Sequence, residues 1–398
     1  MKNIYLCGPT VYNTPHIGNM RPIITFDIYI RALNNLGIKT HLIHNITDID
    51  DKIIIKAKEE NVSEIDIAER YTTEYKELLT NYNISTINSM PKVTENIQLI
   101  IEFIEELISK DAAYISDGSV YFSVKNSENY GSISNKNLEH MNFEHKKHKK
   151  HPGDFALWKK TNEGVKFDSP WSKGRPGWHT ECSLFINKEL KGKTLDIHGG
   201  GIDLIFPHHE NEAAQYESIT GNQITKEWKH IGQLSLNGEK MSKSLGNTLD
   251  ASRFADEVGP DVLRMLFLTT SPTRPINLKD ELVKQLIEQT DKWASAFAKL
   301  QLGEYKEIEI KELSTLISEW KFAEANKNIN EALKEFNKIQ KNGSEIYSIM
   351  KLLGFNFSKN IISKEIKNKY NKWKLFRKTG KYSEADLLRN ELSEYKLI

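Results

Sequence analysis

The first fifty residues contain the pattern that most restricts how this chain can fold. A short apolar run at residues 3–7 precedes a Gly/Pro/Thr turn, and the next segment shows helical periodicity that stops at Gly37. A second strand-like run follows at residues 40–47. This β-loop-α-β order is the unit of a parallel sheet, where ligands bind at the strand ends. No G-x-G-x-x-G motif is present, so nothing in the sequence supports a dinucleotide-binding protein.

Later segments continue the α/β pattern and then leave it. The predicted elements are helices over 52–80 and 93–110, a hairpin over 114–124 around Asp117-Gly118, and further strands and helices over 178–231. From about residue 275 onward the pattern is helical to the end. We therefore expect an α/β part followed by an all-α part.

Composition excludes several classes of protein. Lys and Arg number 55 against 54 Asp and Glu, so the chain has no overall basic field. No apolar run approaches the length of a membrane span, and no charged-then-apolar leader precedes the first strand, so we expect a cytoplasmic protein. The two cysteines are too few for a disulfide framework.

Residues 206–216 read FPHHENEAAQY and suggest half of a metal site. His208 and Glu212 are four residues apart, so they share one face of a helix that Pro207 is predicted to begin. The alternative is a helix start whose acidic residues favour its dipole. Cys7 and Cys182 would complete a four-ligand zinc site, or else they are inert buried thiols. The sequence alone does not show that these residues converge.

Two basic segments raise the question of RNA binding. Residues 351–380 carry nine Lys and Arg against the single acid Glu365, with aromatic residues among them. Such a segment suits a phosphate backbone and stacked bases, or equally an amphipathic surface helix whose aromatics lie in the core. We interpret the run HKKHKKH at 145–151 as a solvated loop rather than a metal tract or nucleic-acid patch.

Several motifs resemble those of class I aminoacyl-tRNA synthetases. PHIGN at 15–19 resembles their HIGH signature, and KMSKS at 240–244 is identical to their second signature. The segments YLCGPTVYNTPHIGN, NITDIDDK, PWSKGRPGWHTECS and DIHGGGIDLIFPHHENE look like the cysteinyl-tRNA synthetase family almost word for word. The resemblance is strong over residues 3–270 and looser through the helical tail.

The resemblance implies a Rossmann-like parallel-sheet catalytic domain with an inserted connective subdomain, followed by an all-α C-terminal helical bundle. The implied divisions are a first catalytic half (1–90), an acceptor-end insert (91–175), a second catalytic half with the zinc site and the KMSKS loop (176–245), a stem-contact region (246–300) and a helical tRNA-binding domain (301–398).

The implied activity is ATP-dependent ligation of cysteine to tRNA(Cys) through a cysteinyl-adenylate. The implied zinc ligands are Cys7, Cys182, His208 and Glu212. Because a thiolate is a far better zinc ligand than an alcohol, zinc would separate cysteine from serine without an editing domain. His209 and Glu210 are expected to support the ligands rather than bind metal. Mg²⁺ would accompany ATP, and we expect a monomer.

The resemblance also assigns substrate residues. Catalytic roles fall on His16, Asn19, Lys240 and Lys243. ATP contacts fall on Gly8, Thr10, His16, Gly18, Gly199, Gly200, Gly201, Asp203 and Lys243, and cysteine contacts on Thr47, Trp178 and His198. The plainer alternatives are a strand end for Thr47, a core position for Trp178 and a simple turn for the glycines. Asn19 replaces the family's usual second histidine, so we expect activity to be kept with a changed phosphate contact.

The helical tail departs from the family pattern. The sequence stops soon after KYSEADLLRNEL, whereas relatives usually continue into a small piece that contacts the anticodon. We therefore expect tRNA to be held through phosphates, with these candidate contacts: Lys367, Lys369, Lys372, Lys374, Arg377 and Lys378. Two other functions stay open. One is a cysteine ligase of the same scaffold acting on an amino sugar, which the basic tail disfavours. The other is a non-catalytic tRNA- or zinc-binding protein, which the intact KMSKS disfavours.

Overall fold

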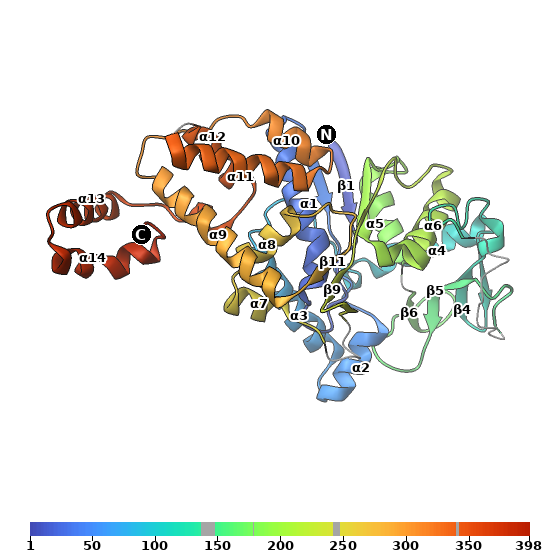
Figure 1. Cartoon of the computed structure of the whole chain (residues 1–398). Coiled ribbons are helices and arrows are strands. Elements are labelled where there is room, and N and C mark those ends of the chain that lie inside the picture. Colours follow the sequence, from blue (N-terminus) through green and yellow to red (C-terminus); the bar gives the residue numbers. More distant parts are fainter. Residues whose placement is uncertain (137–147, 178, 242–246, 340–341) are drawn as a thin grey trace. The chain divides into compact units, whose positions relative to one another are not determined.

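The chain forms two compact units, each assembled from segments that lie far apart in the sequence. The computed structural model in Figure 1 describes residues 1–136, 148–177, 179–241, 247–339 and 342–398. The first unit contains residues 1–14, 40–77 and 87–233, and the second contains residues 15–39, 78–86 and 234–398. The five domain divisions expected from the sequence stay a prediction.

A parallel sheet lies in the first unit, as predicted. Its strands are β1 (Lys2–Leu6), β2 (Thr40–Ile43), β7 (Ile197–Gly201) and β8 (Trp228–Ile231), in the order β2-β1-β7-β8. All three pairings are parallel, and Tyr5 faces both Ile43 and His198 across its neighbours. Residues 4–6 are fully buried, as expected for a strand covered on both faces. Since β1 ends at Leu6, Cys7 lies directly beyond its carboxyl end.

Five of the helices that the structure describes accompany this sheet. They are α2 (Asp51–Glu60), α3 (Glu64–Asn81), α4 (Ile97–Ser109), α5 (Thr180–Leu190) and α6 (Glu210–Thr220), with a 3-10 turn at Thr94–Asn96 before α4. Three of them, α4, α5 and α6, contribute to one hydrophobic core with the sheet. The single helix predicted over 52–80 is wrong. Two helices occupy the region, because Asn61 takes the left-handed conformation (φ 53°) and ends α2.

An antiparallel sheet interrupts the α/β pattern. Its strands are β3 (Ala113–Ser116), β4 (Ser119–Phe122), β5 (Phe155–Lys160) and β6 (Gly174–Pro176), paired in that order. The predicted hairpin around Asp117-Gly118 is confirmed: both residues have positive φ, 49° and 76°, as a tight two-residue turn requires. A 3-10 turn at Val124–Asn126 follows it.

The second unit is mostly helical. Its elements are α1 (Ile17–Asn35), α7 (Ala251–Glu257), α8 (Pro260–Leu268), α9 (Asp280–Leu300), α10 (Lys311–Ser318), α11 (Phe322–Ile339), α12 (Gly343–Leu352) and a three-stranded sheet of β9 (Leu234–Leu236), β10 (Glu239–Lys240) and β11 (Ile276–Leu278). β11 corrects the expectation of an all-helical chain from residue 275. Residues 23–30 of α1 are all buried, so the helix is covered on every face.

The chain closes in a two-helix hairpin of α13 (Lys364–Lys378) and α14 (Tyr382–Glu394), preceded by a 3-10 turn at Asn356–Lys359. Tyr370 and Trp373 stack with ring centroids 5.9 Å apart and pack against its small apolar core. Those two aromatics therefore belong to the hairpin core rather than to a free stacking surface. None of the helices that the structure describes is long and apolar enough to cross a membrane.

Candidate metal centre

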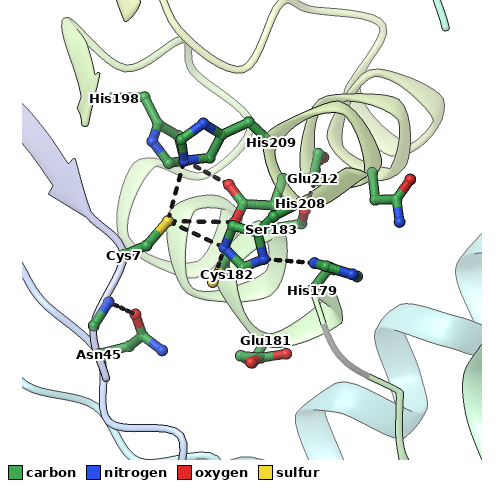
Figure 2. A network of polar contacts seen from close by, with 12 residues as sticks. Cys7, Asn45, His179, Glu181, Cys182, Ser183, His198, His208, His209 and Glu212 are labelled. Carbon is green, nitrogen blue, oxygen red and sulfur yellow. Dashed lines mark hydrogen bonds and ion pairs between the residues drawn. The ribbon is translucent and has the colours of Figure 1, made fainter. Parts of the chain in front are cut away.

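Four side chains, three of them buried and one partly exposed, converge beyond the carboxyl end of β1. Figure 2 shows Cys7, Cys182, His208 and Glu212, here called the ligand cluster, whose ligand atoms all lie within 4.8 Å of one another. Cys7 Sγ is 3.3 Å from His208 Nε2 and 3.4 Å from Glu212 Oε1. His208 Nε2 is 2.6 Å from Glu212 Oε1 and 4.0 Å from Cys182 Sγ. The set that the sequence left open is thus brought together in space, and it could hold a metal ion.

Different elements deliver these ligands. Cys7 follows β1 and is fixed by its backbone N–H, which donates to Gly199 O at 3.3 Å. Cys182 lies in the first turn of α5. His208 lies in the irregular turn Ile205–His209, and Glu212 in the first turn of α6. Within Ile205–His209 only Phe206 has non-helical dihedrals (φ −133°, ψ 131°), so helical backbone begins at Pro207, as predicted, and the regular α-helix α6 follows from Glu210.

The chemistry of the ligand cluster fits a thiophilic divalent cation. Burial raises the pKa of the Cys7 thiol to about 12, and burial likewise raises the pKa of Cys182 well above its usual value. Burial would also raise the pKa of Glu212. Its two histidine partners, His208 and His198, nevertheless hold the pKa of Glu212 well below its usual range. Two thiolates and a carboxylate shielded from water need a cation to compensate their negative charge. Two sulfurs, an imidazole and a carboxylate are ligands that zinc accepts.

Two further histidines fix the orientation of the ligands. His198, on β7, lies with Nε2 2.6 Å from Glu212 Oε2, and His179 Nδ1 is 2.5 Å from His208 Nδ1. Ser183 Oγ donates to the backbone carbonyl of Glu212 at 2.8 Å. Such outer contacts orient metal ligands and tune their basicity. Sequence reasoning missed His179, although it stands in the GWHTECS motif three residues before Cys182.

His209 and Glu210 differ in how they relate to the cluster. His209 Nε2 is 3.6 Å from Cys7 Sγ, and a second possible ligand set joins Cys7, His198, His209 and Glu212. His209 Nδ1 is also 3.0 Å from His230 Nε2. Glu210 instead accepts from the backbone N–H groups of Gly131 and Ser134, at 2.7 and 2.9 Å. Glu210 therefore orders a loop and does not face the metal position.

A hydrogen-bonded chain connects the loops after β1 and β2. Gly8 N–H donates to Asn45 Oδ1 at 2.8 Å, Asn45 Nδ2 donates to Thr47 Oγ1 at 3.2 Å, and Thr47 Oγ1 donates to Glu181 Oε1 at 3.1 Å. A Cβ at Gly8 would lie 1.6 Å from Asn45 O, so only glycine fits. Thr10 and Thr47 also form a parallel backbone bridge. Asn45 and Glu181 were missed, because no spacing rule singles them out.

Gly200 and Gly201, at the end of β7, have side chains packed close to them. A Cβ at Gly200 would lie 2.7 Å from His209 Nε2, and one at Gly201 would lie 2.4 Å from Asp203 Oδ1. Gly199 pairs with Leu6 in the sheet. These contacts explain the glycines locally, and their contact with ATP stays a prediction.

The predicted phosphate-binding residues of the second unit gather at the start of α1. His16 is the N-cap: its Nδ1 accepts from Asn19 N–H at 3.3 Å, and Asn19 Oδ1 accepts from His16 N–H at 3.1 Å. Asn19 thus completes a capping box, which is a local reason for its presence. A Cβ at Gly18 would lie 3.0 Å from the His16 ring. Lys240 lies in β10. Trp178, Lys243 and residues 145–147 of the basic run lie outside the described residues.

Solved structures share this fold. The chain matches Mycobacterium tuberculosis methionyl-tRNA synthetase in complex with methionyl-adenylate with a TM-score of 0.65 and 14% identity, over 89% of this chain and 90% of that chain. A leucyl-tRNA synthetase complex of Agrobacterium radiobacter K84 matches with a TM-score of 0.64 and 11% identity, over 89% and 83% of the two chains. Residues 1–288 match the family model described as the tRNA synthetases class I (C) catalytic domain. Fold and family model together define a class I aminoacyl-tRNA synthetase.

Curated relatives narrow the class to one family. The chain is 44% identical to a cysteine--tRNA ligase of Mesomycoplasma hyopneumoniae (strain J), over 98% of this chain and 96% of the relative. It is 40% identical to a cysteine--tRNA ligase of Malacoplasma penetrans, over 100% of this chain and 96% of the relative. The chain belongs to the cysteine--tRNA ligase family.

Proposed function

We propose that the protein activates cysteine with ATP, transfers it to tRNA(Cys), and uses zinc held by the ligand cluster to select the substrate thiol. Membership of the cysteine--tRNA ligase family supports the reaction. The observation that carries the selection mechanism is the convergence of the ligand cluster, whose ligand atoms lie within 4.8 Å of one another and of whose side chains only Cys7 is partly exposed. A shape-based pocket would separate sulfur from oxygen by only a few kcal/mol, so a coordination site is the stronger device.

The protein's residues prepare this selection. Zinc, when bound, supplies a Lewis acid that prefers a thiolate to an alcohol and lowers the pKa of a thiol beside it. His198 holds Glu212, and His179 holds His208, each by a contact of 2.5–2.6 Å. The hydrogen-bonded chain from Gly8 through Asn45 and Thr47, in the loops that follow β1 and β2, to Glu181 in the first turn of α5 forms a polar wall. We propose that the amino and carboxyl groups of cysteine bind at this polar wall. We assign the side-chain contacts with cysteine to Thr47, Trp178 and His198.

The phosphate chemistry needs positioning and positive charge. The cysteine carboxylate attacks the α-phosphate of Mg²⁺-bound ATP, pyrophosphate leaves, and a terminal ribose hydroxyl of tRNA then displaces AMP from the cysteinyl-adenylate. We assign phosphate contacts to His16 and to the N-terminus of α1, whose dipole favours anions. Lys240 and Lys243 of KMSKS would neutralise the charge that develops on the phosphate oxygens. The remaining ATP contacts are assigned to Gly8, Thr10, Gly18, Gly199, Gly200, Gly201 and Asp203.

Contacts with the tRNA backbone are assigned to α13. Of the candidate contacts, Lys372, Lys374, Arg377 and Lys378 are exposed and Lys367 is half-buried. Lys369 is already bound by Glu365 and Glu391, each at 2.7 Å, so it contributes less to the field that RNA would meet. Binding through phosphates makes affinity fall steeply with salt. An affinity for tRNA that stays flat from 50 to about 200 mM salt would reject this role for α13.

Metal content and substrate choice test the selection mechanism. Purified protein is expected to hold one zinc ion, and a chelator should abolish cysteine-dependent pyrophosphate exchange and leave serine unused. Glu212→Gln should lose the metal. Glu210→Gln is the matched control, because Glu210 lies on the same helix but contacts backbone N–H groups instead. Equal zinc content in the two variants would refute the assignment of Glu212 as a ligand. If activated cysteine were transferred to an amino sugar and not to tRNA, the alternative function as an amino-sugar ligase would hold instead.

A further inference from the structure

One carboxylate joins the start of α2 to the antiparallel sheet. Asp51 is the first residue of α2; its Oδ1 accepts from Arg175 Nη2 at 2.5 Å, and its Oδ2 accepts from Lys159 Nζ at 2.9 Å. Lys159 on β5 and Arg175 on β6 are register partners, so they are direct neighbours across the two strands. Asp51 therefore bridges both strands at once, and these three residues are here called the Asp51 junction.

The Asp51 junction holds two like charges together. Two cations directly opposite each other on adjacent strands repel, and the carboxylate of Asp51 offsets that repulsion. Burial acts to raise the pKa of Asp51, but hydrogen bonds from Lys159 and Arg175 lower it below its usual value, so the group is ionised at neutral pH. Arg175 Nη1 also donates to Glu163 O at 3.2 Å, which fixes the guanidinium at a second point. Removing the charge of Asp51 should therefore loosen β5 and β6 from α2.

The Asp51 junction borders the polar wall. One small pocket is lined by residues of both: Asp51, Lys159 and Arg175 of the junction, and Thr47 and Glu181 of the wall. Thr47 lies four residues before Asp51, in the loop that leads from β2 into α2. Movement of the junction would thus change the space beside the position that we assign to cysteine.

The backbone after Arg175 leads from the junction to the ligand cluster. Gly177 N–H donates to a backbone carbonyl of β5 at 2.7 Å, and a Cβ at Gly177 would lie 1.8 Å from Ala156 O, so this backbone lies tightly against β5. His179 follows two residues later, and its Nδ1 is 2.5 Å from Nδ1 of the ligand His208. The short segment from Arg175 to His179 is therefore held at one end by the junction and at the other by the ligand cluster.

We propose that Asp51 and Arg175 are positioning residues for cysteine: their ion pair fixes the segment that ends at His179 relative to Thr47 and Glu181. The inference rests on the proposed function, because it takes cysteine as the substrate. Neither residue needs to touch cysteine. Without the ion pair, β6 and the residues after it would shift against the polar wall, and the affinity for cysteine would fall. The phosphate contacts assigned to the start of α1 and to KMSKS involve no residue of the junction, so ATP should bind as before.

Two measurements on the zinc-loaded protein test the proposal: the Kd of cysteine by titration calorimetry and the KM of ATP in cysteine-dependent pyrophosphate exchange. Asp51→Asn and Arg175→Gln should each raise the Kd of cysteine about fivefold, which is the scale of a partly exposed ion pair, and leave the KM of ATP unchanged. The reversed pair, Asp51→Arg with Arg175→Asp, again places one carboxylate beside two cations. It should restore the Kd of cysteine to nearly the value of the unmodified protein.

A second ion pair between α2 and the same sheet provides the matched control. Lys58 Nζ on α2 is 2.7 Å from Glu163 Oε2, in the loop between β5 and β6, and both side chains are exposed. Neither residue lines the pocket that contains Thr47. Lys58→Gln should therefore leave the Kd of cysteine unchanged. An equal rise in Lys58→Gln and Asp51→Asn would show that any loosening of the sheet has this effect, and would overturn the role of Asp51.

Folding and function are checked on the same preparations. The Asp51 side chain is 49% exposed, so Asp51→Asn should fold and keep its zinc, because the junction contains no residue of the ligand cluster. An unchanged Kd of cysteine in Asp51→Asn and Arg175→Gln would overturn the proposal. So would a rise in the KM of ATP as large as the rise in the Kd of cysteine, or a folded reversed pair that restores nothing. Absence of exchange in an unmodified protein that binds cysteine would refute the proposed function alone, since calorimetry still decides the role of the junction.

Discussion

Replacing Arg264 with methionine should destabilise the second unit by about 3–5 kcal/mol, because it breaks a buried ion pair. Arg264 is 1% exposed, and its Nη1 donates to Asp27 Oδ2 at 2.8 Å. The same guanidinium donates to Tyr82 O at 2.6 Å and to Leu353 O at 3.0 Å. It therefore joins α1, α8 and two other segments of the second unit through one planar group. Methionine fills similar space but leaves a carboxylate and two carbonyls with fewer partners.

The loss of stability should be large, but it is limited by the partners that Asp27 keeps. Asp27 keeps Arg31 at 2.8 Å and Thr86 at 3.0 Å, which places the cost within the range for a broken buried pair rather than above it. In urea, with a slope of about 2–3 kcal/mol per M, the midpoint should fall by about 1–2.5 M.

A double variant separates charge from packing. Combining Asp27→Asn with Arg264→Met removes both charges, so it should cost less than Arg264→Met alone, because no buried charge stays uncompensated. Urea unfolding followed by circular dichroism measures all variants. If Arg264→Met costs under about 1 kcal/mol, or if the two changes simply add, the view of Arg264 as a buried clamp is wrong.

Three further outcomes are expected. Asn19→Ala should lower the stability of α1 by about 1 kcal/mol, seen as a reduced melting temperature, because it removes one half of the capping box; Asn19→His, which can accept the same bond, should lose less. Burial lowers the pKa of His44 to about 4; the unfolded chain therefore binds this proton first as pH falls below about 6.5, and stability should drop by roughly 3 kcal/mol between pH 6.5 and 4. Urea unfolding at pH 7 and 4.5 measures this pH dependence of the free energy of unfolding, which should be smaller in His44→Gln than in the unmodified protein. The same pH dependence in both proteins would contradict the role of His44. Gly8→Ala should yield little folded protein, since its Cβ would collide with Asn45 O, and normal soluble yield and metal content would show that the loop can move.

Local signals in the sequence predicted those parts of the fold that depend on local chemistry. The parallel strands follow from apolar runs, and the Asp117-Gly118 turn from its demand for positive φ. The break at Asn61 escaped notice because one left-handed residue hardly disturbs a helical pattern. The helical backbone that begins at Pro207 was predicted from the proline, but the irregular turn over Ile205–His209 that precedes the regular helix α6 was not.

The residues of the site likewise fall into those that the sequence predicted and those that it did not. The residues of the ligand cluster were predicted, but their chemistry left Cys7 and Cys182 open as either zinc ligands or inert thiols, since spacing cannot show that they converge; the resemblance decided for the zinc site. His179, Asn45 and Glu181 were missed because their roles depend on which side chains fold against them. Composition also gave no sign that α1 belongs to a different unit from β1.

That separation of α1 from its flanking strands matters while the protein is being made. The helix is covered on every face, yet α8 and α10, which pack against it, begin at residues 260 and 311. At about 5–20 residues per second, the ribosome needs roughly 10–60 s to synthesise these partners after α1 emerges. For that interval a strongly apolar segment has no native surface to cover it. The nascent chain should therefore depend on chaperones until its second half appears, and a stall before residue 260 should expose it to aggregation and proteolysis.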